Sequence, residues 1–209
     1  MFAELASRRE GGSHLDTLIY RFDDPRRAIS SAPVGGGLGL RHWSVNAEVS
    51  TNYEREDLVA HVAEIAGTFH LAGDGVGMLT AASVSQRQRA SKDGVDVEAT
   101  VGLSHPTWAA SDRDEQTPAV GTINIVLFVP VPLSDSALVN AVVTVTEAKT
   151  QALLDASISA SGTPSDAVAI FCPIGETAEE FCGPRSLWGS RVARLVHQAV
   201  FAGAEVWAQ

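Results

Sequence analysis

The predicted fold depends most on residues 121–151, which read GTINIVLFVPVPLSDSALVNAVVTVTEAKTQ. The run Ile123–Val131 has the length and the β-branched content of a strand that is buried on both faces. Two prolines end the run, because proline cannot donate a hydrogen bond to a sheet. Ser134 or Asp135 can then cap a long helix by accepting hydrogen bonds from its free amide groups.

That helix is apolar on nearly all sides, which is typical of a helix inside a domain. Its polar exceptions are Asn140, Thr144, Glu147 and Gln151, whose spacing of four, three and four residues places them on one stripe. Asn124 adds a polar group on the preceding strand. Buried polar groups need partners or a ligand, so the stripe is either part of a binding site, a solvated edge or an internally satisfied hydrogen-bond network.

Composition bounds the class of protein. The chain has 209 residues, of which 45% are hydrophobic and 19% charged, and its net charge is −10. Nucleic-acid binding relies on clustered Lys and Arg, which the sequence lacks, so we expect no nucleic-acid partner. No apolar run approaches membrane-spanning length, and we expect a cytoplasmic protein without a membrane partner. The sequence does not decide between a monomer and a homo-oligomer.

The order of elements predicts an α+β fold: a layered single domain with a mixed, largely antiparallel sheet and about three main helices. Residues 1–14 are expected to form a loose leader, and residues 15–209 the domain. A doubly wound parallel sheet is less expected, because strands and helices alternate strictly only near the end. The predicted strands are Asp16–Phe22, Ala28–Ala32, Leu40–Val49, Met78–Val84, Val95–Leu103, Ile123–Val131 and Ala167–Cys172, and the helices are Glu54–Phe69, the segment after Asp135, and Leu187 to about Val206.

Familiar sequence motifs give little support for a specific chemistry. The glycine cluster Gly35–Gly39 lies between two strands and lacks the Lys-Ser/Thr pair of a phosphate-binding loop. It is either a hairpin with positive-φ glycines or a place where backbone amides approach a ligand. The six histidines show no paired spacing, and the two cysteines match no zinc pattern, so no metal site is expected. Cys172 and Cys182 are expected to be packed thiols.

The remaining polar residues define a candidate site. Glu147 or Asp166 could supply a carboxylate base, and Lys149 could supply a charge or a proton. Asparagine side chains could hold or polarise a carbonyl group. These residue types predict a polar site in an α+β domain, but they do not name a substrate.

The segment GTINIV…PLSDSALVNAVVTVTEAKTQALLD closely resembles the signature of the adenosylcobinamide amidohydrolase family. Further motifs follow the family in the same order, from about Arg21 to Gly203. The chain departs from the family in one loop, whose usual sequence is GT-small-TDA. Here the loop reads Gly162-Thr163-Pro164-Ser165-Asp166-Ala167, with a proline at the position of the small residue and a serine in place of the second threonine. The other motifs are SSAPVGGGLG (30–39) with residues 41–46 after it, GVGMLTAASV (75–84), ATVGLSHPTWA (99–109) and GPRSLWGSRVARLVHQAV (183–200).

The resemblance implies a reaction. The family hydrolyses the amide that joins a propionyl side chain of the corrin ring to aminopropanol, and it yields adenosylcobyric acid for cobalamin synthesis. A corrinoid is then the substrate, and no cofactor is expected. The alternatives are a corrinoid-binding protein of the same fold that has lost turnover, and a hydrolase of another bulky amide.

Amide hydrolysis needs an activated nucleophile, donors for the oxyanion and a proton for the departing amine. Under the resemblance, Glu147 or Asp166 activates water, and Lys149 protonates the leaving group or orients the carboxylate. A threonine nucleophile, Thr122 or Thr163, is the alternative. The residues expected to bind the substrate are Asn46, Asn124, Asn140, Thr163, His105 and the backbone of Gly35, Gly36 and Gly37.

Overall fold

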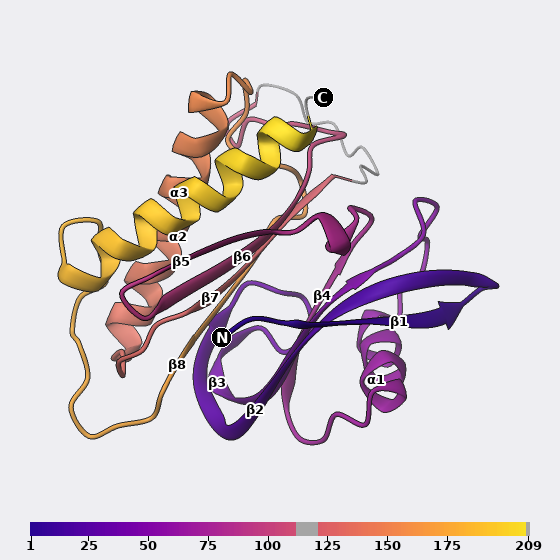
Figure 1. Ribbon diagram of the computed structural model, residues 1–209, viewed down its shortest axis with the longest axis horizontal. Helices are drawn as coiled ribbons and strands as arrows, with labels where there is room; N and C mark the ends of the chain where they lie inside the picture. The colour runs from indigo at the N-terminus through magenta and orange to yellow at the C-terminus, as the bar shows by residue number, and fades with distance from the viewer. Residues whose placement is uncertain (112–120, 208–209) are drawn as a thin grey trace.

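The computed structural model describes residues 1–111 and 121–207 of the chain. These residues form one mixed sheet and three α-helices (Figure 1). The elements are β1 (Glu4–Glu10), β2 (Ser13–Ser30), β3 (Gly37–Glu48), α1 (Leu58–Thr68), β4 (Gly75–Thr80), the short 3-10 helix η1 (Val84–Gln86), β5 (Gln88–Lys92), β6 (Val95–Gly102), β7 (Thr122–Phe128), α2 (Asp135–Asp155), β8 (Ala167–Cys172) and α3 (Leu187–Trp207).

The sheet has the strand order β4-β3-β2-β8-β7-β6-β5, and β1 pairs separately with β2. Five of the strand pairs are antiparallel, and the pairs β3–β4 and β7–β8 are parallel. The predicted α+β class and the mixed, largely antiparallel sheet are therefore confirmed. All seven residues of β7 are buried, as the run of β-branched residues predicts for a strand covered on both faces.

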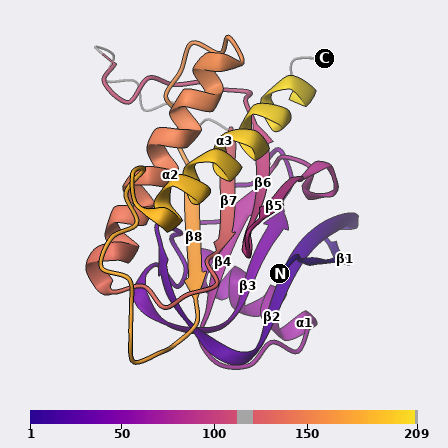
Figure 2. The ribbon, with the colours of Figure 1, turned by 60° about the vertical axis from the view of Figure 1, so that its left-hand side comes forward.

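Three apolar clusters divide the molecule into layers. The largest packs α2 and α3 against β5–β8, and the smallest packs α1 against β2 and β3. The remaining cluster joins side chains of β2 and β4 to side chains of β7 and β8. The sheet is therefore curved, and its two halves, β2–β4 and β5–β8, face each other across this cluster. Figures 1 and 2 show α2 and α3 together on one side of the molecule and α1 on the other.

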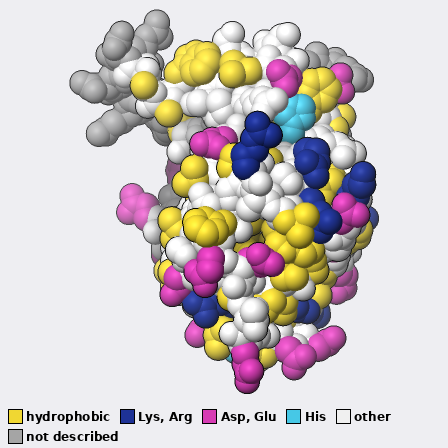
Figure 3. Space-filling model, turned by 90° about the vertical axis from the view of Figure 1, so that its left-hand side faces the viewer, with side chains coloured by type: hydrophobic (Ala, Val, Ile, Leu, Met, Phe, Trp, Pro, Cys, Tyr) yellow, Lys and Arg dark blue, Asp and Glu magenta, His cyan; other side chains and the backbone are white. Residues whose placement is uncertain are grey.

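The helix α2 begins as expected but is not buried on all sides. Ser134 caps it, because its Oγ accepts a hydrogen bond of 3.2 Å from the amide of Ala137. Val139 and Val143 are about half exposed, at 52% and 48%. The expectation of a helix enclosed by the domain is wrong, since the outer face of α2 lies at the surface. Figure 3 shows this side of the molecule, where apolar side chains lie between charged ones.

The N-terminal residues are not a loose leader. Residues 4–10 form β1, which pairs with residues 13–19 of β2 as an antiparallel hairpin. Gly11 and Gly12 make its turn with φ values of +55° and +86°, which glycine adopts without a steric penalty. The strand is also anchored by Arg8, whose side chain is buried. The polar composition of this segment concealed a strand that covers an edge of the sheet.

The two short strands predicted at Asp16–Phe22 and Ala28–Ala32 are one long strand, β2. The residues DDPRR between them form an irregularity in the pairing with β3, where the register shifts between Arg21 and Arg26. Pro25 can lie there because a bulge removes the demand for its missing amide. The polar tract Ser85–Gly94, which follows the predicted strand Met78–Val84, contains the end of η1 and the whole of β5.

Candidate functional site

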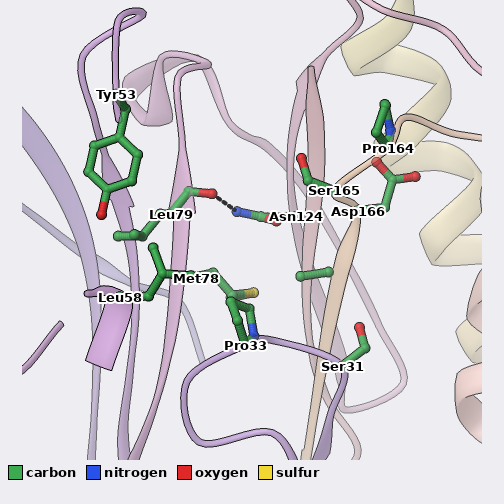
Figure 4. Close-up of a pocket in the computed structure, with 11 residues that line it drawn as sticks. Ser31, Pro33, Tyr53, Leu58, Met78, Leu79, Asn124, Pro164, Ser165 and Asp166 are labelled. Carbon is green, nitrogen blue, oxygen red and sulfur yellow. Dashed lines mark hydrogen bonds between the residues drawn. The ribbon is translucent and has the colours of Figure 1, made fainter. Parts of the chain in front are cut away.

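A cavity of about 390 Å³ lies between the two halves of the sheet (Figure 4). One wall comes from β4 and from the start of α1 with the segment before it, and the opposite wall from the loop that precedes β8. Asn124 of β7 lies between these walls. The residues that line the cavity are Ser31, Pro33, Tyr53, Leu58, Met78, Leu79, Asn124, Pro164, Ser165, Asp166 and Ala167.

Asn124 has an oxygen without a partner. The residue is 1% exposed, and its Nδ2 donates to Oδ1 of Asn46 over 2.9 Å and to the carbonyl of Leu79 over 3.2 Å. Both of these atoms are acceptors, so they fix which end of the Asn124 amide is the nitrogen. Among the described residues, no group donates to Oδ1 of Asn124. A buried acceptor of this kind is satisfied at low cost only when a ligand or a water supplies a hydrogen.

Asp166 is surrounded by donors from three directions. Its Oδ1 accepts from the amide of Ile123 over 2.9 Å and lies beside the hydroxyl of Thr163. Its Oδ2 accepts from the amide of Thr163 over 3.1 Å and pairs with Nζ of Lys149. Each carboxylate oxygen already faces two donors, so Asp166 holds the loop 162–167 on β7 and α2 and has little capacity left to accept a proton from water.

The loop also presents a hydroxyl group to the cavity. Ser165 Oγ lies 2.6 Å from Oγ1 of Thr122 and 2.9 Å from the carbonyl of Gly121. Thr163 Oγ1 lies 2.8 Å from the same carbonyl. Ser165 and Asp166 line the cavity. Thr122 and Thr163 lie behind them, where their hydroxyls bond to Ser165 and Asp166 respectively.

The structure brings together about half of the residues that the sequence proposed. Asn124 and Asp166 line the cavity, Asn46 bonds to Asn124, and Lys149 and Thr163 bond to Asp166, while Thr122 bonds to Ser165. This cluster joins segments that are widely separated in the sequence, because β3, β7 and β8 meet around one interior.

The polar stripe on α2 is not part of the cavity. Glu147 and Gln151 lie on its exposed face. Asn140 Oδ1 accepts from the amide of Cys182 over 3.2 Å, and Thr144 Oγ1 donates to the carbonyl of the same residue over 2.8 Å. The stripe is thus part solvated edge and part internal network, and the idea that it forms one ligand-binding surface is wrong. It anchors the segment before α3 instead.

The glycine cluster and His105 also lie outside the cavity lining. Gly35 has a φ of +70°, and a Cβ built there would lie 1.9 Å from the carbonyl oxygen of Gly75. Gly36 is packed in the same way against the carbonyl of Ala32, at 2.3 Å. These two glycines thus permit close packing of the turn between β2 and β3. Of the two interpretations of the glycine cluster, this packing favours the hairpin over a ligand-binding loop. His105 is exposed.

The sequence did not single out two of the cavity residues, Ser31 and Tyr53. Ser31 lies within the family motif SSAPVGGGLG, where the glycines drew attention instead. Tyr53 lies in a polar turn, and nothing in its neighbourhood signalled a site. Among the described residues, no group of three or more His, Cys, Asp or Glu side chains is placed to hold a metal ion.

Comparison with known proteins gives a consistent picture. The family model of adenosylcobinamide amidohydrolase matches residues 2–209. An adenosylcobinamide amidohydrolase of Methanosarcina mazei is 28% identical over 199 residues, which cover 91% of this chain and 94% of that protein. An adenosylcobinamide amidohydrolase of Halobacterium salinarum is 38% identical over 118 residues, which cover 53% of this chain and 50% of that protein.

Proposed function

The chain belongs to the adenosylcobinamide amidohydrolase family, and from this premise we propose that it hydrolyses the amide between a propionyl side chain of the corrin ring and aminopropanol. The products are adenosylcobyric acid, which re-enters cobalamin synthesis, and the free amino alcohol. Water supplies the oxygen of the new carboxyl group, and the corrinoid is a substrate that leaves changed, in contrast to a resident cofactor. Its place of action is the cytoplasm. Within the described residues, no helix is both long and apolar enough to cross a membrane.

The unpartnered oxygen of Asn124 is the observation that carries this proposal. An amide substrate offers an N–H donor, which is the type of group that Oδ1 of Asn124 lacks. Because Asn46 and Leu79 hold the other end of the side chain, the oxygen is fixed in advance and needs no reorganisation when the substrate binds. A cavity of about 390 Å³ is within the size range of small-molecule sites. It is smaller than a corrin ring with its adenosyl ligand, so the side chain with the amide enters while the ring stays at the opening.

The loop 162–167 has a positioning role in this proposal. Lys149 and the two amide donors fix Asp166, and Asp166 fixes the loop that carries Ser165. The hydroxyl of Ser165 lines the cavity and donates to the carbonyl of Gly121 over 2.9 Å. It donates to the substrate's carbonyl oxygen, as negative charge develops there, only by exchanging this bond. Ser165 keeps the hydroxyl that the family has at this place, although the threonine methyl group is missing.

The test is incubation of the purified protein with adenosylcobinamide, followed by chromatography and mass spectrometry of the corrinoids. We expect adenosylcobyric acid and aminopropanol from the unmodified protein and from Asn140→Ala, which removes an asparagine outside the cavity. Asn124→Ala should lower turnover by about 10- to 100-fold, since it removes one positioned hydrogen bond. A urea unfolding curve for each variant separates loss of the site from loss of the fold.

Other outcomes would overturn the proposal in different ways. A shift in the corrinoid absorption spectrum with unchanged adenosylcobinamide identifies a binding protein without turnover. Hydrolysis of other bulky amides with none of adenosylcobinamide identifies a different substrate class. Equal turnover by Asn124→Ala and the unmodified protein removes Asn124 from the site.

A further inference from the structure

Tyr53 lies on the side of the cavity opposite Ser165 and Asp166 (Figure 4), and it begins a chain of polar groups. Tyr53 lines the cavity, and its hydroxyl lies 2.7 Å from Nδ1 of His61 on α1. His61 is 1% exposed, and its Nε2 lies 3.1 Å from Oε2 of Glu10, although the contact does not have the geometry of a regular hydrogen bond. Arg8 holds the same oxygen of Glu10 through Nε at 3.1 Å and Nη2 at 2.8 Å.

The charge on Glu10 decides where the protons lie. Burial by itself raises the pKa of Glu10, but the close contact with His61 and the hydrogen bonds from Arg8 outweigh it and hold the pKa below its ordinary value. An ionised Glu10 accepts only, so Nε2 of His61 carries the proton and Nδ1 is free to accept from the hydroxyl of Tyr53. Burial also raises the pKa of Tyr53, which keeps its hydroxyl protonated near neutral pH.

The reaction needs such a group, because the opposite wall does not provide it. Hydrolysis of an amide requires an acceptor for a proton of the attacking water and a donor for the departing nitrogen. Asp166 already faces four donors, and Ser165 and Thr122 are hydroxyls without an adjacent base. A hydroxyl bonded to a histidine that is backed by a carboxylate has the arrangement of a hydrolytic triad, which is recognised by geometry rather than by sequence position.

We propose that Tyr53 is the acid–base group of this site, that His61 stores the transferred proton, and that Glu10 and Arg8 position His61. The inference rests on the proposed amide hydrolysis. Tyr53 is the catalytic residue, since it lines the cavity, and the other three act through it.

The proton transfers balance over one turnover. As water attacks the carbonyl carbon and the C–O bond forms, one water proton moves to the oxygen of Tyr53 while the proton of Tyr53 moves to Nδ1 of His61. The resulting imidazolium faces the Glu10 carboxylate. When the C–N bond breaks, His61 returns its proton to Tyr53, and Tyr53 protonates the departing nitrogen. The products are a carboxylic acid and an amine, and the three side chains regain their starting states.

The charged groups around His61 fit this role. Glu10 and Arg8 reach it from β1. The carbonyl of Asp57, at the start of α1, accepts from the backbone amide of His61 over 3.0 Å, and Glu64 follows His61 by three positions on α1. Asp57 and Glu64 are paired with Arg55 in turn. An imidazolium formed at His61 therefore has a carboxylate in contact and further negative charge nearby, which stabilises the intermediate state.

The test compares turnover of adenosylcobinamide by Tyr53→Phe, His61→Gln and a matched control, His197→Gln. His197 is also paired with a carboxylate, with Nε2 at 2.8 Å from Oδ2 of Asp155, but it lies on α3 outside the cavity lining. Tyr53→Phe should lower kcat by at least about 100-fold with little change in KM, because it removes one hydroxyl and keeps the ring. His61→Gln should also lower kcat with little change in KM, because it removes the group that accepts the proton of Tyr53. His197→Gln should match the unmodified protein in both respects.

Two negative results have different meanings. If the unmodified protein binds adenosylcobinamide but does not hydrolyse it, the proposed function fails and the relay fails with it. If the unmodified protein is active and a folded Tyr53→Phe keeps its kcat and its pH profile, the hydrolase stands and the relay is wrong. The urea midpoint and the affinity for adenosylcobinamide, measured for each variant, show whether a loss of kcat reflects chemistry or misfolding.

Discussion

Asn46 of β3 and Asn124 of β7 are joined by a side-chain hydrogen bond of 2.9 Å, although 78 positions separate them in the sequence. Both side chains are 1% exposed. The bond bridges the two halves of the curved sheet, and it continues from Nδ2 of Asn46 to the hydroxyl of Thr100 over 3.0 Å. The same network that ties the layers together therefore orients the unpartnered oxygen in the cavity.

Replacing Asn46 should weaken both the fold and the site. Asn46→Ala leaves Nδ2 of Asn124 with one acceptor and removes the donor to Thr100, and unsatisfied buried groups of this kind cost about 1–3 kcal/mol of unfolding free energy. Urea unfolding followed by circular dichroism measures this loss, with the exposed Asn52→Ala as control. KM for adenosylcobinamide should also rise, because Asn124 is no longer held in place. An Asn46→Ala protein as stable as the control would show that the network contributes nothing.

The buried pair of Lys149 and Asp166 makes a second prediction. Their side chains are only 10% and 13% exposed. Asp166→Asn leaves the Lys149 ammonium buried without a counter-charge, which should cost about 3–5 kcal/mol. Lys149→Met should cost less, because Asp166 keeps its donors from Ile123 and Thr163. The double variant should then lose less than the sum of the two single losses, because it contains no unpaired charge.

A surface pair provides the control for that cycle. Arg191 and Asp93 lie 3.6 Å apart, and the Asp93 side chain is 46% exposed. Asp93→Asn should change the unfolding free energy by no more than about 1 kcal/mol, since exposed pairs are screened by water. Strictly additive losses for the Lys149 and Asp166 variants would contradict the assignment of a coupled buried pair.

Local sequence patterns were sufficient for most of the fold. The strand Ala167–Cys172 and the start of α3 at Leu187 were predicted at the positions where they occur, because apolar runs there are bounded by glycine, proline and small residues. The N-terminal hairpin was missed because β1 is polar: it lies at the edge of the sheet, and only its pairing with β2 makes it a strand. Pairing partners are non-local, and no periodicity within β1 encodes them.

The candidate site was predictable only in part for a related reason. The loop that carries Asp166 and the strand with Asn124 are both adjacent to the segment that determined the fold, so the sequence indicated them. Tyr53 contributes through a histidine on the next helix and a glutamate on the first strand, and these three residues share no motif. Glu147 was chosen for its residue type, but α2 turns it to the outer face, and periodicity could not decide which side of α2 faces the core.

The two cysteines should be unreactive in the folded protein. Both are buried and free, and burial raises the pKa of Cys172 and raises that of Cys182 to about 11. At about pH 8 these thiols are almost entirely neutral, and the thiolate is the reactive form. Alkylation by iodoacetamide should therefore be slow in buffer and fast for two thiols in urea. Rapid labelling of either cysteine without denaturant would contradict the packing described for the α2 and α3 layer.

The carboxylate of Glu10 should make stability depend on pH. Because its pKa is lowered in the folded protein, from an ordinary value of 4.5, the folded state binds fewer protons than the unfolded state in this range. The stabilisation is fully present above the unfolded pKa and is lost as pH falls through the folded pKa. Glu10→Gln lacks this titration, so the unfolding free energy of the unmodified protein minus that of the variant should shrink as pH falls from about 7 to about 3.

Urea unfolding at several pH values measures this difference, and Glu4→Gln is the matched control on the same strand. The Glu4 side chain is 60% exposed and lies 3.6 Å from Nε of Arg21, so its difference from the unmodified protein should stay nearly flat across the range. A Glu10 difference that is equally flat would mean that the carboxylate has no favoured charged state beside His61 and Arg8. It would then also remove the reason for placing the proton of His61 on Nε2, on which the direction of the Tyr53 hydrogen bond depends.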